Sequence, residues 1–173
     1  MTDNRPRKAR RTVTWARPIL DGAAVVKMRG LDLMSAMKDG RFPPPPVWSL
    51  VNFRLLEFGE GRAVMEMTPA EYHYNRFGVV QGGILCPVLD AAAGYAVHST
   101  LPAGTGYTTL DLKVNYLRPV SVETGPLRCV GRIVHRGSRV CLAEADLTDG
   151  NGRLYAHAVS TCLLFKLSKK RAA

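Results

Sequence analysis

The sequence predicts an α+β fold, in which a curved antiparallel sheet of about six strands wraps around one long central helix, preceded by an N-terminal helical extension. Between Ile84 and Val97 nearly every residue is apolar or small, which is typical of a helix buried on all sides. Around this helix, segments of alternating apolar and polar residues are separated by glycine-containing turns, which is typical of antiparallel strands. At 173 residues, the chain suits one domain with a sizeable core.

The N-terminal part is expected to form an extension of the main domain. Apolar residues three apart predict a helix over residues 22–38, and Gly40 suits its C-terminal cap. The prolines from Pro43 to Pro46 then force a stiff, extended connection. The expected organisation is a basic arm and helical extension over residues 1–42, the main domain over residues 43–168 and a basic tail over residues 169–173.

The strands follow in two groups. Before the central helix, a hairpin is expected to join residues 48–58 to residues 62–68 through the turn at Gly59–Gly61. After the helix, turn residues at Arg118–Pro119, Gly137 and the segment DGNG delimit four more expected strands, over residues 108–117, 127–135, 140–148 and 153–167.

In the first strand after the helix, the alternation predicts two opposite faces. Leu110, Leu112, Val114 and Tyr116 are expected on the core face, and Thr109, Asp111, Lys113 and Asn115 on the other. A sheet of this length covers most of one helix and leaves the rest bare. A second copy of the chain is the expected cover.

Asp90 is the single charge within the apolar helix. A carboxylate in such a place costs free energy unless it is hydrogen-bonded, paired or neutralised. Its helical neighbours are mostly small, which leaves space above the carboxylate. Asp90 is therefore a candidate functional group; the alternative is that it only bonds a buried backbone group.

Gly82 and Gly83 open the central helix without side chains. A ligand can therefore approach the unpaired N–H groups and the positive end of the helix dipole, an arrangement that polarises a carbonyl. The alternative is that the two glycines only permit a sharp turn. Asp90 lies about 10.5 Å along the axis from Gly83, at 1.5 Å per residue. One helix cannot serve one carbonyl with both groups, so Gly83 of one subunit is expected to face Asp90 of another.

The charge distribution argues against a broad nucleic-acid-binding surface. The first 17 residues hold six Lys or Arg against one Asp, and residues 166–173 hold four more. These tails carry almost all of the net charge of +10, so the body is close to neutral. Basic tails of this kind are typical of solvated chain ends. Weak binding to nucleic acid or anionic lipid is the alternative.

Composition also bounds location and cofactors. No apolar run reaches the length of a membrane span, and the first residues lack the apolar core of a signal peptide, so a cytoplasmic location is expected. The four cysteines are dispersed, form no CxxC pair and lie in apolar surroundings. They indicate small core residues rather than a zinc or redox site, and no metal or other cofactor is expected.

The run HYNRFGVVQGGILCPVLDAAAGYAVHSTLPAGTGYTTLDLKVNYLRPV resembles the hotdog-fold acyl-CoA thioesterases of the phenylacetate-degradation (PaaI) type. The family pattern has an Asn or Gln, a His-Gly-Gly, an Asp or Glu nine residues after the His, and a Thr-rich strand that ends in Arg-Pro. The resemblance covers residues 43–165. The matching positions are Asn75, Gln81, Gly82, Gly83, Asp90, Thr108, Thr109, Arg118 and Pro119.

The resemblance implies a role for each matching residue. Asp90 would act as nucleophile or general base, and the Gly83 N–H of the facing subunit would polarise the carbonyl. Asn75 would orient the substrate or the attacking water, Gly82 would adjoin the substrate, and Thr109 would line the acyl pocket. Arg136 and Arg139 are candidates for the phosphates of coenzyme A; solvated surface arginines are the alternative.

The chain departs from the family at two positions. Gln81 stands where the family has His, and it can hydrogen-bond but cannot carry a proton at neutral pH. Gly94 stands where a Ser or Thr is frequent, in the substrate site. These changes bear on water positioning and on substrate range. His73 and His98 lie nearby as alternative acid-base groups, or as structural residues.

The function that follows is hydrolysis of an acyl-CoA to a free acid and coenzyme A, by a homodimer or a dimer of dimers with its active site between subunits. One alternative is an acyl-CoA-binding or sensor protein without catalysis on the same fold. A hydratase or dehydratase on this fold is a second alternative, and its expected His and acid arrangement is not visible in the sequence.

Overall fold

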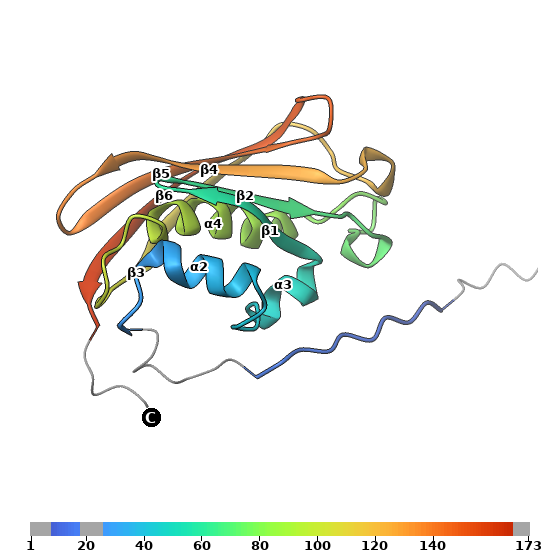
Figure 1. Cartoon of the computed structure of the whole chain (residues 1–173). Helices are drawn as coiled ribbons and strands as arrows, with labels where there is room; N and C mark the ends of the chain where they lie inside the picture. The colour runs from blue at the N-terminus through green and yellow to red at the C-terminus, as the bar shows by residue number, and fades with distance from the viewer. Residues whose placement is uncertain (1–7, 18–25, 168–173) are drawn as a thin grey trace, which may run out of the picture.

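The structure is a computed structural model that describes residues 8–17 and 26–167. Its centre is a six-stranded antiparallel sheet with the strand order β1-β2-β4-β5-β6-β3. The sheet curves around α4 (Gly82–His98) (Figure 1). The predicted fold class and the six strands are confirmed. The strands are β1 (Phe53–Gly59), β2 (Arg62–Met67), β3 (Thr105–Tyr116), β4 (Leu127–Arg136), β5 (Val140–Thr148) and β6 (Leu154–Lys166).

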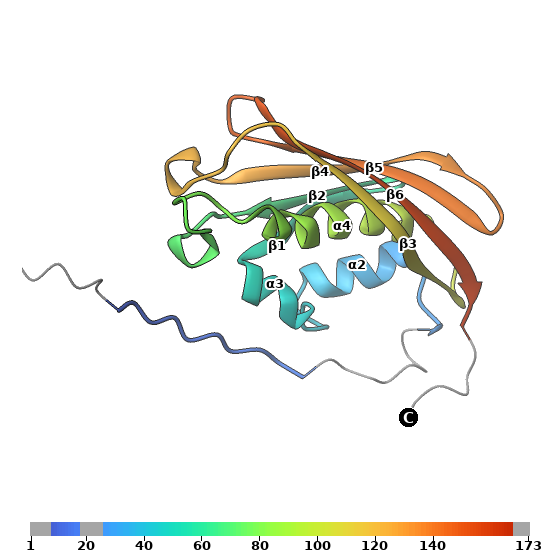
Figure 2. The same cartoon turned by 180° about the vertical axis from the view of Figure 1, so that it is seen from behind.

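The molecule has three layers. The sheet forms the first, α4 lies beneath it, and α2 (Gly30–Lys38) and α3 (Pro46–Val51) lie on the side of α4 away from the sheet (Figures 1 and 2). Two short 3-10 helices, η1 (Glu71–His73) and η2 (Val122–Thr124), complete the connections. The helical layer therefore covers part of α4 that the sheet leaves bare.

The sheet and α4 meet most closely at Gly131 on β4. A Cβ atom placed on Gly131 would lie 2.0 Å from the carbonyl oxygen of Ala92 on α4, which no side chain tolerates. On the same side of α4, small and branched side chains such as Val88, Leu89 and Ala92 are fully buried. This close approach fixes α4 against the middle of the sheet.

One stripe of α4 is not covered in the single chain. Cys86, Pro87, Asp90, Ala91 and Tyr95 follow one another at helical spacing, and all are only partly buried. The expectation of a helix buried on all sides is therefore wrong for one chain. Residues three and four apart share a helix face, and this face is bordered by β3 on one side, where Thr109 bonds Asp90, and by α2 at Tyr95, which bonds Met37.

The N-terminal extension is helical but shorter than predicted. The helix predicted over residues 22–38 is interrupted: Val26 is helical, residues 27–29 are not, and α2 begins at Gly30, whereas residues 22–25 lie outside the described part. Gly30 starts the helix because its backbone packs on α4: a Cβ there would lie 1.7 Å from the His98 carbonyl oxygen. At the other end, Gly40 has a φ of +75° and terminates the helix as predicted.

The extension shares the core of the main domain. Met34 and Ala36 of α2 are fully buried. The structure shows this shared packing but does not test where the extension ends and the main domain begins. The boundary between residues 42 and 43 therefore stays a prediction. The tail expected over residues 169–173 lies outside the described residues.

The strand predicted over residues 48–58 is a short helix followed by a strand. Pro46 occupies the first turn of α3, where its missing N–H costs no hydrogen bond. Asn52 then ends α3 in the left-handed region, at a φ of 62°, and β1 begins at Phe53. The prediction missed α3 because Trp48 and Val51 read as strand residues in sequence; both are buried and belong to the core.

In the described part of the basic arm, Arg11 attaches to the main domain. Arg11 donates hydrogen bonds to the carbonyl oxygens of Ser49 and Leu50 at the end of α3, and its guanidinium lies 3.9 Å from the centre of the Tyr72 ring. Residues 8–17 are extended and run past α3 (Figure 1). The predicted picture of a purely solvated arm is therefore incomplete at Arg11.

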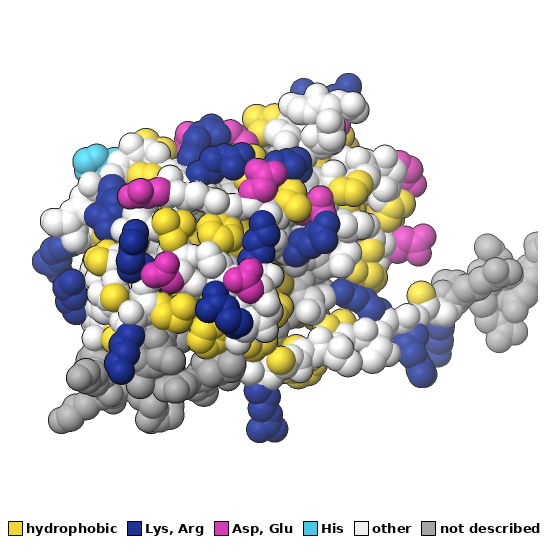
Figure 3. Space-filling model, in the orientation of Figure 1, with side chains coloured by type: hydrophobic (Ala, Val, Ile, Leu, Met, Phe, Trp, Pro, Cys, Tyr) yellow, Lys and Arg dark blue, Asp and Glu magenta, His cyan; other side chains and the backbone are white. Residues whose placement is uncertain are grey.

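Charges on the body are interspersed. Figure 3 shows Lys and Arg side chains alternating with Asp and Glu over the visible face. Ion pairs join neighbouring strands, such as Arg54 with Glu66 at 2.7 Å and Arg132 with Asp146 at 2.7 Å. This pattern agrees with a nearly neutral body, and the absence of nucleic-acid binding stays a prediction. Among the described helices, none has the length and apolar character needed to span a membrane.

Candidate active site

A groove of about 570 Å³ runs along the uncovered stripe of α4. The helix forms one wall, the inner face of β3 forms the second, and α3 with the start of β1 forms the third. Apolar and aromatic side chains dominate it, and Asp90 is its one charged residue. The lining residues are Pro45, Val47, Trp48, Phe53, Gly83, Cys86, Pro87, Asp90, Ala91, Tyr95, Tyr107, Thr109 and Leu112.

A β-bulge turns Thr109 toward Asp90. On β6, Cys162 pairs with Thr109 and the next residue, Thr161, pairs with Asp111, so Leu110 is an extra residue on β3. An extra residue reverses the alternation of faces. Thr109 therefore faces the groove together with Leu112, and Leu110 points outward with 58% of its surface exposed. The predicted faces of Thr109 and Leu110 are wrong, because alternation in sequence does not reveal a bulge.

Thr109 holds one oxygen of the Asp90 carboxylate. Its hydroxyl donates a 2.8 Å hydrogen bond from Oγ1 to Oδ1 of Asp90. The alternative in which Asp90 only bonds a buried backbone group finds no support among the described residues, because the hydrogen bond recorded for this carboxylate comes from a side chain. The second oxygen, Oδ2, is left to meet water or a ligand in the groove.

The two glycines at the start of α4 have different surroundings. A Cβ on Gly82 would lie 3.2 Å from the ring of Tyr116 on β3, so this glycine lets the ring pack flat against the helix. A Cβ on Gly83 would meet nothing within 4 Å, and Gly83 lines the groove. The Gly83 N–H lies in the first turn, where amides lack intrahelical partners. Gly83 is thus the approachable amide of the pair.

Tyr116 and Cys86 flank this end of the groove. The Tyr116 hydroxyl lies 3.0 Å from the Cys86 sulfur. Burial, followed by the hydrogen bond with Cys86, raises the pKa of Tyr116 to about 12, so its hydroxyl is neutral at physiological pH. Neither residue was a sequence candidate, because a lone cysteine and a strand tyrosine carry no motif.

Gly83 and Asp90 line the same groove but lie apart. The helix is continuous from Gly82 to His98 despite Pro87, so seven residues separate them by about 10.5 Å along its axis. A thioester carbonyl needs its nucleophile and its hydrogen-bond donor each at about 3 Å. Within one chain, these two groups cannot act on one carbonyl.

Gln81 and Asn75 lie beside the groove rather than in it. Gln81 precedes α4 with an exposed side chain, and its backbone N–H donates to the His73 carbonyl at 2.8 Å. The Asn75 side-chain oxygen accepts a 2.8 Å hydrogen bond from the Phe77 N–H, which holds the turn before the helix. Their predicted roles toward substrate stay predictions that depend on a second chain.

The structure explains why residue 94 is a glycine, which the sequence did not reveal. A Cβ on Gly94 would lie 2.6 Å from the hydroxyl oxygen of Tyr107, so Tyr107 occupies the space that a Ser or Thr would take. Gly94 itself is buried and does not line the groove. Tyr107 lines the groove at this position, and a substrate contact of Gly94 stays a prediction.

Arg136 and Arg139 lie at the opposite end of α4 from Gly83. Arg136 donates to the hydroxyl and the carbonyl oxygen of Thr100, just beyond the helix, at 2.9 and 3.3 Å. Arg139 is exposed beside the turn between β4 and β5. The single chain does not bring either arginine to the groove, so phosphate binding by them stays a prediction.

The four aromatic residues of the groove were missed in sequence. Trp48 and Phe53 come from the segment read as one strand, Tyr95 from the apolar run of α4, and Tyr107 from just before the expected strand. Aromatic residues in such runs are most simply core residues. Only the structure, in which all four side chains line one groove, distinguishes them from ordinary core residues. Within the described residues, no cluster of His, Cys, Asp and Glu suits a metal ion.

His73 is buried and His98 partly buried, and neither lines the groove. The Nε2 atoms of both rings are buried and make no hydrogen bond within the described residues. Burial lowers the pKa of His98, and burial followed by the charge of Arg11 lowers that of His73. Both rings are therefore held neutral in the folded protein.

These buried histidines predict a loss of stability in mild acid. A folded-state pKa below the ordinary value of about 6.5 means that the unfolded chain binds more protons in this window, so stability is full above about pH 6.5 and falls as the pH drops below it. The melting temperature is expected to fall between pH 7 and pH 5, and less steeply in His98→Phe. His135→Gln, at an exposed site on β4, is the control. Equal slopes for His98→Phe and the wild type would contradict this assignment.

Comparison with known proteins identifies the family. The thioesterase superfamily matches residues 77–156, which include all of α4 and β3. A phenylacetic acid degradation-related protein of Ralstonia eutropha is 31% identical, with a TM-score of 0.69 over 75% of this chain and 97% of that one.

Two further proteins are similar over a large part of their length. The acyl-coenzyme A thioesterase 13 of Mus musculus is 25% identical over 101 residues, which cover 58% of this chain and 71% of that protein. A Streptococcus mutans protein whose structure holds acetyl-CoA is 25% identical, with a TM-score of 0.61 over 68% of this chain and 92% of that one. The chain therefore belongs to the thioesterase superfamily, as a hotdog-fold thioester hydrolase of the phenylacetate-degradation (PaaI) type.

Proposed function

We propose that this protein hydrolyses acyl-CoA thioesters to a free carboxylic acid and coenzyme A. The observation that carries the proposal is the Asp90 carboxylate, held by Thr109 in an otherwise apolar groove that also exposes Gly83 at the start of α4. Such a groove suits an acyl group, and the carboxylate suits the reacting carbonyl. The mouse acyl-CoA thioesterase and the acetyl-CoA-bound Streptococcus protein support coenzyme A as the thiol.

In the proposed reaction, Asp90 acts through Oδ2 while Thr109 fixes Oδ1. As general base, Asp90 takes a proton from water as the water oxygen attacks the thioester carbon. As nucleophile, it attacks that carbon itself, and water later cleaves the resulting anhydride. In both routes the carbon–sulfur bond breaks and the thiolate of coenzyme A takes up a proton, so no oxidant or cofactor is consumed.

The second half of the proposed site comes from another copy of the chain. The Gly83 N–H of the partner subunit would donate to the carbonyl oxygen as negative charge develops on it. Two features support this assembly: the separation of Gly83 and Asp90 along one helix, and the uncovered stripe of α4. A homodimer completes each site, and Arg136 and Arg139 could reach the phosphates of coenzyme A only from another subunit, because neither lines the groove of its own chain.

Gln81 takes the position at which the family carries His. Its exposed amide can donate and accept hydrogen bonds but stays uncharged. We assign to it and to Asn75 the orientation of the attacking water, with Gly82 adjoining the substrate. Proton transfer is left to Asp90.

Thiol release from a panel of acyl-CoAs tests the proposed function. The wild-type protein is expected to release coenzyme A from at least one aliphatic or aromatic acyl-CoA without added metal. The same panel is measured for binding by calorimetry. Binding without release of thiol from any member would overturn hydrolysis and favour the non-catalytic sensor on this fold.

A further inference from the structure

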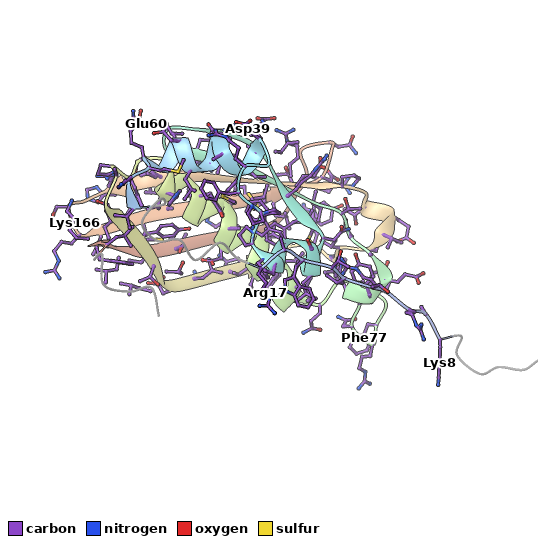
Figure 4. All side chains as sticks on the ribbon, turned by 60° about the horizontal axis from the view of Figure 1, so that its bottom comes forward. Lys8, Arg17, Asp39, Glu60, Phe77 and Lys166 are labelled. Atoms are coloured by element: carbon purple, nitrogen blue, oxygen red, sulfur yellow. The ribbon has the colours of Figure 1, made fainter. Side chains whose placement is uncertain are left out.

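The two ends of the groove differ chemically. Because β3 runs antiparallel to α4, each end is lined by the start of one of these elements and the end of the other. At one end Tyr116 packs on Gly82, in the middle Thr109 bonds Asp90, and at the other end Tyr107 packs on Gly94. In Figure 4, Phe77, in the loop before α4, and Lys166, which bonds Thr105 at the start of β3, lie at opposite ends of the molecule. The Gly83 end is exposed, whereas the Tyr107 end lies against the core.

Tyr107 is seated directly on the helix backbone. A Cβ on Gly94 would lie 2.6 Å from its hydroxyl oxygen and 3.0 Å from its ring. This contact is possible only because residue 94 has no side chain. The ring therefore reaches across the floor of the groove from β3 to α4, one helical turn beyond Asp90.

A chain of aromatic contacts supports Tyr107 from behind. Ring centres lie 5.8 Å apart between Tyr107 and His98, 6.0 Å between His98 and Tyr95, and 5.4 Å between Tyr95 and Trp48. Trp48 in turn lies 5.6 Å from Phe53. Edge and tilted contacts at such distances are favourable. The five rings form a continuous wall, drawn from α3, β1, α4 and β3.

This aromatic wall determines which part of an acyl-CoA thioester can lie at each end of the groove. Among the described residues that line the groove, Asp90 alone is charged, so the lining beyond it toward Tyr107 is uncharged. Burial, followed by smaller effects of Tyr95 and Asp90, raises the pKa of Tyr107 above its ordinary range. A charged, hydrated pantetheine phosphate cannot enter such surroundings without a large desolvation cost. In a complex with an acyl-CoA, the acyl group would therefore point to Tyr107 and the coenzyme would leave through the exposed Gly83 end.

We propose that Tyr107, seated on Gly94, closes the acyl end of the groove and limits the length of the acyl group. This inference rests on the proposed hydrolysis of acyl-CoAs. Asp90 and Gly94 are four residues apart, which leaves about 6 Å along the helix axis between the reacting carbon and the closing ring. Short acyl groups fit this space, and long fatty-acyl chains do not.

Binding and turnover across an acyl-length series test Tyr107 as a specificity-determining residue. Binding of acyl-CoAs from acetyl to palmitoyl is measured by calorimetry in the Asp90→Asn background, where substrate persists, and turnover is measured with Asp90 intact. Tyr107→Ala is expected to improve binding of the longer acyl-CoAs relative to acetyl-CoA by at least about tenfold, because one added methylene in an apolar pocket already has an effect of this order. Turnover is expected to shift toward longer chains in the same way.

Matched variants separate this effect from a loss of folding. Tyr107→Phe keeps the ring and should keep the wild-type profile, as should Thr108→Ala, whose side chain is exposed on the neighbouring position of β3. Tyr107→Leu replaces Tyr107→Ala if the latter does not fold. An unchanged length profile in the folded Tyr107→Ala or Tyr107→Leu variant would overturn the inference.

The two readouts also separate this inference from the proposed function. If the wild type releases no thiol but the binding profile still shifts with Tyr107→Ala, hydrolysis fails and the role of Tyr107 stands. If turnover occurs and neither profile shifts, the role of Tyr107 alone fails. If the wild type releases no thiol and neither it nor folded Asp90→Asn protein binds any acyl-CoA, both are overturned.

Discussion

Asp90→Asn is expected to reduce thiol release by about 10²- to 10⁴-fold, the range found when a positioned acid-base group is lost. The substitution keeps the size and shape of the side chain. The Asn oxygen can still accept the hydrogen bond that Thr109 donates at 2.8 Å. The amide cannot, however, take a proton or form an anhydride, so the loss reports chemistry rather than geometry.

Asp111→Asn is the matched control for this variant. Asp111 lies on β3, two residues from Thr109, and its side chain is exposed away from the groove. The control is expected to retain wild-type activity, and both variants should keep the wild-type melting temperature. Wild-type activity in Asp90→Asn would show that Asp90 is not the reacting group, even with hydrolysis itself established.

Mixed subunits are expected to recover activity that neither parent variant has. Gly83→Pro removes the amide hydrogen but fits the first turn of a helix, where proline is tolerated, and the structure leaves open space at this position. After exchange with Asp90→Asn subunits, about half of the dimers are hybrids and each contains one intact site, so about a quarter of wild-type activity should return. Thiol release is measured before and after exchange.

If each active site lay within one chain, mixing the two variants would restore no activity. Each chain of a hybrid then carries one of the two lesions, so verified exchange without recovery would contradict the shared site. Gly83→Ala is the control for the position itself, because it keeps the N–H and its methyl group meets nothing within 4 Å. This variant is expected to stay active alone.

The strands were predictable because their signals are local. The hairpin between β1 and β2 and the one between β5 and β6 follow from alternation and from the turns at Gly59–Gly61 and DGNG, and five of the six strands begin and end within three residues of the predicted bounds, β1 being the exception. The start of α4 and the position of Asp90 within it were equally visible. Each of these features depends on residues close together in the chain.

The structural predictions were wrong where packing against a distant segment of the chain overrides the local sequence pattern. A short helix replaces the start of the first predicted strand, because Trp48 and Val51 gain more from packing in the core than from strand pairing. Because Leu110 is an extra residue on β3, Thr109 faces the groove and Leu110 faces outward, the reverse of the prediction. The bulge is defined only by the register of β3 with β6. No pattern within either segment alone carries this information.

The sequence by itself determined the fold, the lone carboxylate in an apolar helix, and the separation of Asp90 from Gly83, because periodicity and rise per residue are properties of a single element. The tertiary structure alone decided that Thr109 bonds Asp90 and that Tyr107 fills the space left by Gly94. These contacts join residues of α4 to residues of β3 across space. They depend on strand register and on the absence of one side chain, and neither has a local signal.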